Sequence, residues 1–585
     1  MKELKRLNKY FKKYKYRLLL GVTITILAKV FALFTPKLIG NSINVVAKKL
    51  EEGDLYTTFK ADLGLNILYL IGAAMVAGFF TFLMRQTIIN VSRYVEYDLK
   101  NEIYQQYQRL SLNFYKSNRT GDLMSRITED VSKVRMYFGP AIMYSLNMIT
   151  LFVVALIYML NKAPLLTLYT ILPLPILSIS IYFLSKAIHK RSTLVQENLS
   201  KLSAYTQEAF SGISVIKAYT LEPRINESFN AISVDQRQKY INLTKIQAFF
   251  FPLMILLIGV SNLLVIYIGG TQYINGEITE IGTIAEFIIY VNMLTWPVAA
   301  IGWVTSLVQE AEASQKRINS FLELEPEIQN TVDETTQIHG TIAFNNVTFT
   351  YPDTNITALN KLSFNIKLGE TLAILGKTGS GKSTILDLIG RLYDADSGTI
   401  LIDDKPIDKL NLFNLRDSIG YVPQDAFLFS DTIKNNIRFG KEDASDEQVI
   451  EAAKNAYVHE NIVGFSKDYD TILGERGLTL SGGQKQRISI ARAIIKSPQI
   501  LLFDDCLSAV DTETEEQILK NLDKVSKSKT TIIVSHRISS AKNADQIIVL
   551  EDGKIIQEGN HVSLINTEGY YKDLYLKQLS EKEIS

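Results

Sequence analysis

Six runs of mostly apolar residues dominate the first half of this 585-residue chain. A helix needs about 20 such residues to cross the hydrocarbon core of a lipid bilayer. Six runs in one half of a chain exceed what the buried helices of a soluble core require, so we expect an all-α membrane domain with six transmembrane helices. The runs lie near residues 18–38, 63–87, 137–160, 163–184, 249–270 and 281–304.

The distribution of basic residues predicts how this domain is oriented. Lysine and arginine crowd the N-terminus and the long connections after the second and fourth runs, whereas residues 271–280, after the fifth run, contain none. Cytoplasmic loops carry the excess of basic residues, so both termini are predicted to be cytoplasmic in a multi-pass protein of a bacterial cell membrane. Residues 1–16 are basic and amphipathic, which favours an elbow lying on the membrane surface before a membrane domain over residues 17–316.

Composition excludes several other classes of protein. The formal net charge is only +1, which disfavours a nucleic-acid partner. Cys506 is the only cysteine, so an intramolecular disulfide and a cysteine-cluster metal site are both excluded.

After about residue 340 the chain changes to short strand-like runs, glycine turns and amphipathic helices. Residues 317–337 are polar and acidic and indicate a linker. We expect an α/β nucleotide-binding domain over residues 338–578, followed by a polar tail at 579–585.

A phosphate-binding loop supplies the strongest chemical signal. It follows an apolar run at 371–375, precedes a helix-forming stretch, and has the form G-x-x-x-x-G-K-S. In such a loop, glycines let backbone N–H groups surround phosphates, the lysine neutralises the β- and γ-phosphates, and the serine offers a hydroxyl to Mg²⁺. The expected ATP-binding residues are Gly376, Lys377, Thr378, Gly379, Ser380, Gly381, Lys382, Ser383 and Thr384.

An acidic residue follows a second apolar run, at 500–503. Four consecutive apolar residues favour a strand buried on both faces of a parallel sheet, and ligands bind at the carboxyl ends of such strands. We therefore expect Asp504 to bind Mg²⁺ together with Ser383.

A third motif, Leu-Ser-Gly-Gly-Gln, ends at Gln484 and opens a predicted helix. Its serine, its glycine N–H groups and the helix N-terminus form another anion site. The order of phosphate loop, this motif, acidic strand end and Ser535-His536 resembles the nucleotide-binding domain of ABC (ATP-binding cassette) transporters. With six preceding spans, the chain resembles a half-transporter of the exporter class. The signature residues in this comparison are Ser481, Gly482, Gly483 and Gln484.

The resemblance implies roles for further residues. Tyr351 would stack on adenine, Gln424 would sense Mg²⁺ and the γ-phosphate, His536 would contact the γ-phosphate, and Asp511 would lie in the D-loop. Residues 474–477 resemble the loop that precedes the signature in exporters. Residues 114–126 and 208–219 resemble the two intracellular loops that carry coupling helices. In this family each ATP lies between the phosphate loop of one cassette and the signature of another, which implies a second half-transporter as partner.

One position departs from the family pattern. The residue after the Walker-B aspartate is usually a glutamate that polarises the attacking water, but here it is Asp505. Loss of one methylene shortens the reach of this base, and poor positioning costs on the order of 100-fold in rate. We favour a heterodimer whose partner supplies the glutamate; a homodimer with two slow sites, in which Asp505 still serves as the base, is the alternative.

The transported substrate is the property that the sequence constrains least. The predicted function is ATP-driven export, or flipping, of an amphipathic substrate, and an ATP-gated channel or transport regulator on the same fold is the alternative. Lys29, near the middle of the first span, and Trp296, beside a proline in the sixth, are candidates for the substrate pathway, although snorkelling or ordinary packing also explains them.

Overall fold

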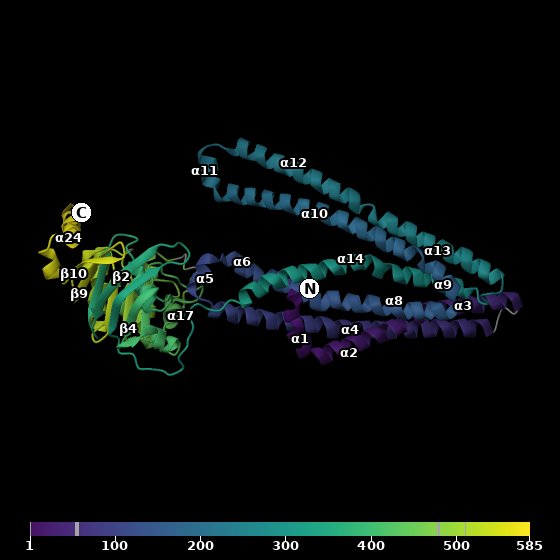
Figure 1. Cartoon of the computed structure of the whole chain (residues 1–585), viewed down its shortest axis with the longest axis horizontal. Coiled ribbons are helices and arrows are strands. Elements are labelled where there is room, and N and C mark those ends of the chain that lie inside the picture. The colour runs from purple at the N-terminus through teal and green to yellow at the C-terminus, as the bar shows by residue number, and fades with distance from the viewer. Residues whose placement is uncertain (1, 53–57, 475–476, 478–479, 509, 585) are drawn as a thin grey trace. The chain divides into compact units, whose positions relative to one another are not determined.

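The computed structural model describes residues 2–52, 58–474, 477, 480–508 and 510–584 (Figure 1). The chain forms two compact units. One comprises Met1–Tyr107 and Gly121–Glu323, and the other comprises Gln108–Thr120 and Leu324–Ser585. The second unit therefore contains a short segment, residues 108–120, that comes from within the helical half of the chain.

Every secondary-structure element among the described residues of the first unit is a helix, as the apolar runs predict. Its helices are η1 (Glu3–Leu7), α1 (Asn8–Lys13), α2 (Lys15–Ala32), α3 (Phe34–Glu52), α4 (Thr58–Arg109), α6 (Thr120–Ser125), η2 (Arg126–Asp130), α7 (Val131–Met136), η3 (Tyr137–Ala141), α8 (Ile142–Lys162), α9 (Pro164–Ile171), α10 (Pro173–Ser211), α11 (Ile213–Ala218), α12 (Glu222–Gln247), α13 (Phe250–Ile274) and α14 (Gly282–Leu322). The 52-residue α4 is far longer than a bilayer requires, in line with a helix that continues beyond the membrane.

Five helical stretches among the described residues are long and apolar enough to cross a membrane: Lys15–Lys48, Ala61–Arg109, Thr120–Lys162, Glu222–Ile274 and Gly282–Leu322. The expected span at residues 163–184 is not among them. It is divided at Leu172 between α9 and α10, each of which begins with a proline. Proline lacks an N–H donor and fits the first turn of a helix, which explains a break at this position. The fourth expected span, at residues 163–184, stays a prediction.

The basic N-terminal segment forms η1 and α1. Leu4, Leu7 and Tyr10 on this segment are buried. Lys13 pairs with Asp98 of α4 at 2.6 Å, and the Tyr10 hydroxyl donates to Glu102 of the same helix at 2.8 Å. The segment is therefore held against α4 by apolar packing and by ion pairs at its basic residues.

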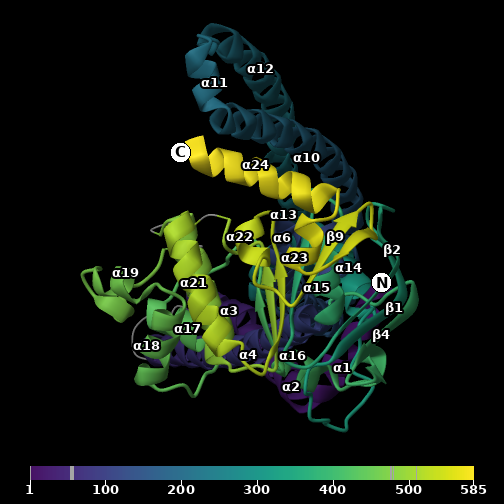
Figure 2. The same cartoon turned by 90° about the vertical axis from the view of Figure 1, so that its left-hand side faces the viewer.

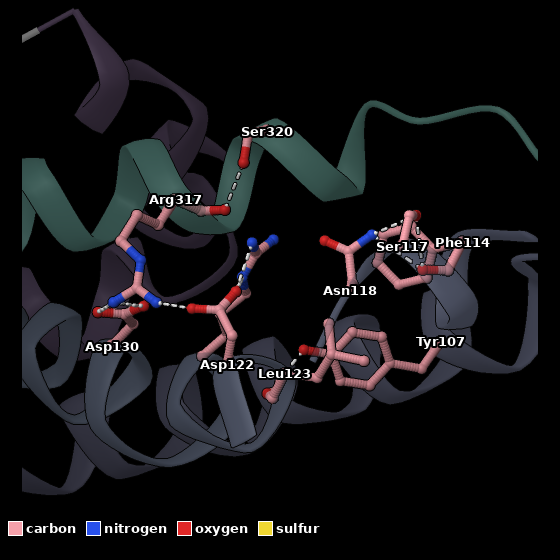
Figure 3. Close-up of polar contacts among 10 residues, drawn as sticks. Tyr107, Phe114, Ser117, Asn118, Asp122, Leu123, Asp130, Arg317 and Ser320 are labelled. Carbon is pink, nitrogen blue, oxygen red and sulfur yellow. Dashed lines mark hydrogen bonds and ion pairs between the residues drawn. The ribbon is translucent and has the colours of Figure 1, made fainter. Parts of the chain in front are cut away.

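An ion-pair network joins the end of α14 to α6 and η2 (Figure 3). Arg317 lies 2.5 Å from Asp122 and 3.1 Å from Asp130. Asp122 also pairs with Arg126 at 2.7 Å, and the Ser314 hydroxyl donates to Asp130 at 2.8 Å. Since Asp130 is only 1% exposed, its charge depends on these partners. The network fixes α6 and η2 to the last helix before the linker.

Asp130→Ala is expected to lower the free energy of unfolding of the helical unit by about 1–3 kcal/mol, because Ser314 and Arg317 lose a buried acceptor. The thermal midpoint of the purified protein in detergent measures this loss. Glu129→Ala is the matched control, since Glu129 is the adjacent acidic residue and is exposed. Equal losses in the two variants would contradict a special role for the buried carboxylate.

The second unit is built on two sheets, seen in Figure 2 with the four-stranded sheet at one side and helices α17, α18, α19 and α21 at the other. The six-stranded sheet has the order β10-β9-β3-β8-β7-β6 and is parallel except for β10; the other has the order β2-β1-β4-β5 and is antiparallel. The strands are β1 (Ile342–Thr350), β2 (Thr357–Ile366), β3 (Thr371–Gly376), β4 (Ser397–Ile402), β5 (Lys405–Pro406), β6 (Ile419–Val422), β7 (Ile500–Asp504), β8 (Thr530–Val534), β9 (Gln546–Glu551) and β10 (Lys554–Gly559).

All five residues of β7 are buried, which agrees with the prediction of a strand covered on both faces. The predicted α/β nucleotide-binding domain is confirmed. Its helices are α5 (Leu112–Ser117), α15 (Lys382–Ile389), η4 (Ile407–Lys409), α16 (Leu412–Asp417), α17 (Ile433–Arg438), α18 (Asp446–Asn455), α19 (His459–Val463), η5 (Asp468–Asp470), α20 (Gly482–Ile495), α21 (Thr512–Val525), α22 (Ile538–Ala541), α23 (His561–Ile565) and α24 (Tyr570–Ile584).

Two element boundaries differ from those expected from composition. The helix α14 continues to Leu322, past the expected start of the linker at residue 317, and α24 continues to Ile584, through the expected polar tail. Polar residues are tolerated in a helix that has left the membrane, so polarity alone does not mark the end of a helix.

Candidate functional site

The phosphate loop connects β3 to α15, as predicted. Its backbone requires glycine at two positions. A Cβ atom on Gly376 would lie 2.3 Å from the carbonyl oxygen of Leu550, and one on Gly381 would lie 2.3 Å from that of Ala358. Both residues also have positive φ angles, +148° and +99°, which side chains disfavour. The sequence therefore folds here into a tight turn at a helix N-terminus, which suits a phosphate.

The two lysines of this loop differ in where their side chains lie. The Lys382 ammonium is buried and donates to the carbonyl oxygens of Gly376 at 3.0 Å and Lys377 at 2.8 Å. The Lys377 ammonium instead pairs with Glu551 at 2.9 Å on the surface. Burial lowers the pKa of Lys382, and the carboxylates of Asp505 and Asp504 oppose this shift. Only Lys382 is thus placed to act inside the loop.

Ser383 and Asp504 meet as the sequence predicts. The Ser383 hydroxyl donates to Asp504 at 2.9 Å, at the carboxyl end of β7. Asp504 is 5% exposed, and burial raises its pKa, against the hydrogen bond from Ser383. Carboxylate and hydroxyl oxygens are ligands that Mg²⁺ prefers. Among the described residues, no three His, Cys, Asp or Glu side chains gather as a metal site.

Asp505 and His536 are both partly buried, and each influences the pKa of the other. Burial raises the pKa of Asp505, while His536 and then Lys382 oppose this shift. Burial lowers the pKa of His536, and the charge of Lys382 adds to this. The backbone of Asp505 has a positive φ of +42°, and its N–H donates to the carbonyl oxygen of Val534 at 2.9 Å. The carboxylate and the imidazole are therefore presented at the ends of the adjacent strands β7 and β8.

Tyr351 lies beside the first turn of α15. Its hydroxyl is 2.9 Å from that of Thr384, next to Ser383. Its ring makes edge contacts with Phe349, at 5.0 Å between centroids, and with Tyr393, at 5.6 Å. These contacts hold the Tyr351 ring beside the first turn of α15, next to the phosphate loop.

The signature residues open α20, as predicted. The Ser481 hydroxyl accepts from the Gln484 N–H at 3.3 Å, and the Gln484 side chain accepts from the Ser481 N–H at 2.9 Å, which forms a capping box. Ser481 and Gly482 are exposed. The side-chain hydrogen bonds of Ser481 are thus made with Gln484, within the signature itself.

The remaining predicted residues of the cassette lie on other elements of the second unit. Asp511 caps α21 by accepting from the Thr514 N–H at 2.9 Å. Gln424 is exposed just after β6, and its carbonyl oxygen is 3.4 Å from the Gln486 amide. Of the expected loop at 474–477, Glu475 and Arg476 lie outside the described residues.

In the helical unit, the two pathway candidates are on α2 and α14. Lys29 is partly buried on α2, and Trp296 is 68% exposed on α14. The next residue, Pro297, lines a cavity of about 450 Å³ between α8 and α14. Trp296 is not among the lining residues of this cavity.

One residue near the site was not predicted from the sequence. The Lys116 ammonium, on α5, lies 4.7 Å from the ring centroid of Tyr351. The only signal available was that residues 114–126 resemble an intracellular loop expected to contact a cassette. Which side chain of the loop meets the aromatic residue could not be read from the sequence.

Comparison with known proteins agrees with this geometry. Residues 18–298 match the family described as the ABC transporter transmembrane region, and residues 359–508 match the family described as ABC transporter. The chain is 36% identical over 577 residues to the multidrug resistance-like ATP-binding protein MdlA of Escherichia coli (strain K12), covering 98% of this chain and 96% of the relative.

Two further comparisons cover nearly the whole chain. It is 35% identical over 580 residues to the probable multidrug resistance ABC transporter ATP-binding/permease protein YheI of Bacillus subtilis (strain 168), covering 98% of this chain and 97% of the relative. A solved bacterial Atm1-family ABC exporter with ATP bound superposes with a TM-score of 0.79 at 26% identity, covering 96% of this chain and 98% of that one.

These matches confirm the family predicted from the motifs, since both the membrane region and the cassette are found in one chain. The fold and the phosphate loop agree with a nucleotide-binding, multi-pass membrane protein that couples ATP hydrolysis to export. The chain therefore belongs to the ABC transporter family, as a half-transporter of the exporter type.

Proposed function

We propose that this chain is half of a pump that exports an amphipathic small molecule across a bacterial cell membrane, with both termini in the cytoplasm. The observation that carries the proposal is a phosphate loop in which the Lys382 ammonium is buried and Ser383 donates a hydrogen bond to Asp504. The same chain also contains helices long and apolar enough to cross a membrane. The cavity between α8 and α14 supports an apolar cargo, because Met148, Phe152 and Ile301 are among its mostly apolar lining residues. The relatives' names, which include multidrug resistance, point the same way.

Each site residue has a proposed task in hydrolysis. Lys382 would release its two carbonyl partners and neutralise the β- and γ-phosphates of ATP. Ser383 and Asp504, with Gln424, would hold Mg²⁺, which when bound supplies charge neutralisation between the phosphates. His536 would contact the γ-phosphate, and Asp505 would orient the attacking water. Tyr351 would stack on the base.

We propose further that two chains share each ATP. Ser481 and Gly482 are exposed at the start of α20, so they are available to the phosphate loop of a partner. The shorter side chain of Asp505 favours a heterodimer, in which the partner supplies a glutamate at the corresponding position. Binding of ATP would then favour the closed pair of cassettes by its differential affinity for that state.

Transport in reconstituted vesicles tests the proposed export. In vesicles with outward-facing cassettes, ATP is expected to drive accumulation of a hydrophobic fluorescent amine, together with ATPase stimulation by that dye. The Lys382→Ala protein is the control and should accumulate none. Ion current on addition of ATP, without accumulation of any amphipathic dye, would instead favour a channel.

Ser481→Arg tests the shared site. Arginine would fill the space intended for a partner's phosphates, so hydrolysis by the dimer should fall by at least about 10-fold while ATP binding to this chain's own loop is retained. Turnover and binding of a fluorescent ATP analogue report these two effects. Ser489→Arg would be a poor control because Ser489 is buried, so Lys485→Ala, also on α20, serves instead. Full activity in Ser481→Arg would rule out sharing.

A further inference from the structure

A lysine of the first intracellular loop, Lys116, lies over two aromatic residues of the cassette. Lys116 lies on α5, within the same compact unit as the cassette. Its ammonium is 4.7 Å from the ring centroid of Tyr351 and 5.0 Å from that of Tyr393. A lysine over an aromatic ring within about 6 Å is attracted by the negative face of the ring.

The two rings under Lys116 are themselves firmly held. Tyr393 is 4% exposed and packs against Phe349 at 5.3 Å between centroids. Tyr351 contacts both rings and meets Thr384 through its hydroxyl. Movement of Lys116 would therefore displace Tyr351 and alter its contact with Thr384 in the first turn of α15, next to the phosphate loop.

The charge of Lys116 also acts on α15 directly. Burial raises the pKa of Asp387 to about 6, and Lys116 is the charge that opposes this shift. Asp387 lies one turn beyond Ser383 on the same helix. Lys116 is thus the loop residue whose contacts and charge both reach the nucleotide site.

We propose that Lys116 is a positioning residue for the base of ATP: it holds Tyr351 in the orientation on which adenine stacks. The proposal rests on the proposed role of Tyr351. Coupling between two sites is reciprocal. If the contact between Lys116 and Tyr351 strengthens ATP binding, then bound ATP also stabilises that contact. The first intracellular loop would therefore sense the base, whereas Lys382 senses the phosphates.

The test compares affinity for ATP with affinity for inorganic tripolyphosphate, which has no base. Both compete with a fluorescent ATP analogue on the full-length protein in lipid nanodiscs. Lys116→Met keeps the length of the side chain and removes its charge, so it should weaken ATP competition about two- to five-fold. It should leave tripolyphosphate competition unchanged. Lys116→Arg should restore ATP affinity, and Arg119→Met, which removes an exposed cation of the same loop, should have no effect.

Comparing Tyr351→Ala with Lys116→Met distinguishes the proposed role of Lys116 from that of Tyr351. Tyr351→Ala should weaken ATP more than Lys116→Met does, and adding Lys116→Met to it should cost nothing further. If Tyr351→Ala weakens ATP binding but Lys116→Met does not, the inference on Lys116 is wrong and Tyr351 keeps its role. If neither variant changes affinity, both assignments fail. Equal weakening of ATP and tripolyphosphate by Lys116→Met would overturn the proposal, since it would indicate contact with phosphate or a distorted site.

Discussion

Lys382→Ala is expected to reduce ATP hydrolysis at this chain's phosphate loop by at least about 100-fold, the typical loss when one preorganised electrostatic group is removed. The Lys382 ammonium is buried within the loop, where it donates to two carbonyl oxygens. Burial lowers the pKa of Lys382, because the protonated ammonium is less stable there than in water. Negatively charged phosphates would stabilise that charge. Release of inorganic phosphate by the reconstituted protein measures the change.

Lys377→Ala is the matched control for this experiment. Lys377 belongs to the same loop and has the same charge, but its ammonium pairs with Glu551 on the surface. Most of the turnover should survive, because the loop contributes the backbone of this residue rather than its side chain. A loss in Lys377→Ala as large as that in Lys382→Ala would mean that general loosening of the loop, and not the buried charge, explains both results.

Asp505→Glu is expected to raise hydrolysis at the same site by up to on the order of 100-fold, if aspartate is too short to orient water. The added methylene carries the carboxylate further from the end of β7, toward the position that the usual glutamate occupies in this family. Phosphate release is measured for this chain alone and together with a partner half-transporter. Lys382→Ala in the same background should abolish the gained activity.

Asp505→Asn distinguishes the two dimers proposed for this chain. In a heterodimer with a degenerate site, the wild-type aspartate contributes little, so the asparagine variant should hydrolyse at nearly the wild-type rate. In a homodimer that uses Asp505 as the base, the same change should remove most of the activity of the chain alone. No gain from Asp505→Glu, combined with a large loss from Asp505→Asn, would contradict the degenerate-site proposal.

Local sequence patterns predicted most of the site. The phosphate loop, the buried strand ending at Asp504 and the cap at Ser481 each depend on neighbouring residues, so each can be recognised from a short segment. The meeting of Ser383 with Asp504 followed from a general property of parallel sheets, whose ligands bind at the carboxyl ends of strands.

Contacts between distant segments could not be predicted in the same way. Lys116 and Tyr351 are brought together by the fold of the second unit, and no local pattern pairs them. Arg317 pairs with Asp122 and Asp130, which are likewise distant from it in the sequence. The break at Leu172 depends on Pro173, inside an apolar run whose length and hydropathy alone indicate one continuous helix.

The membership of residues 108–120 in the second unit has a consequence during synthesis. Leu112 packs against the apolar core that Ile342, Phe364 and Ile402 help to form. The segment leaves the ribosome long before those residues, and at about 5–20 residues per second the delay is on the order of tens of seconds. Through that interval the apolar surface on which Leu112 packs does not yet exist. A ribosome that stalls before the cassette is finished therefore leaves the Leu112 side chain without its packing partners.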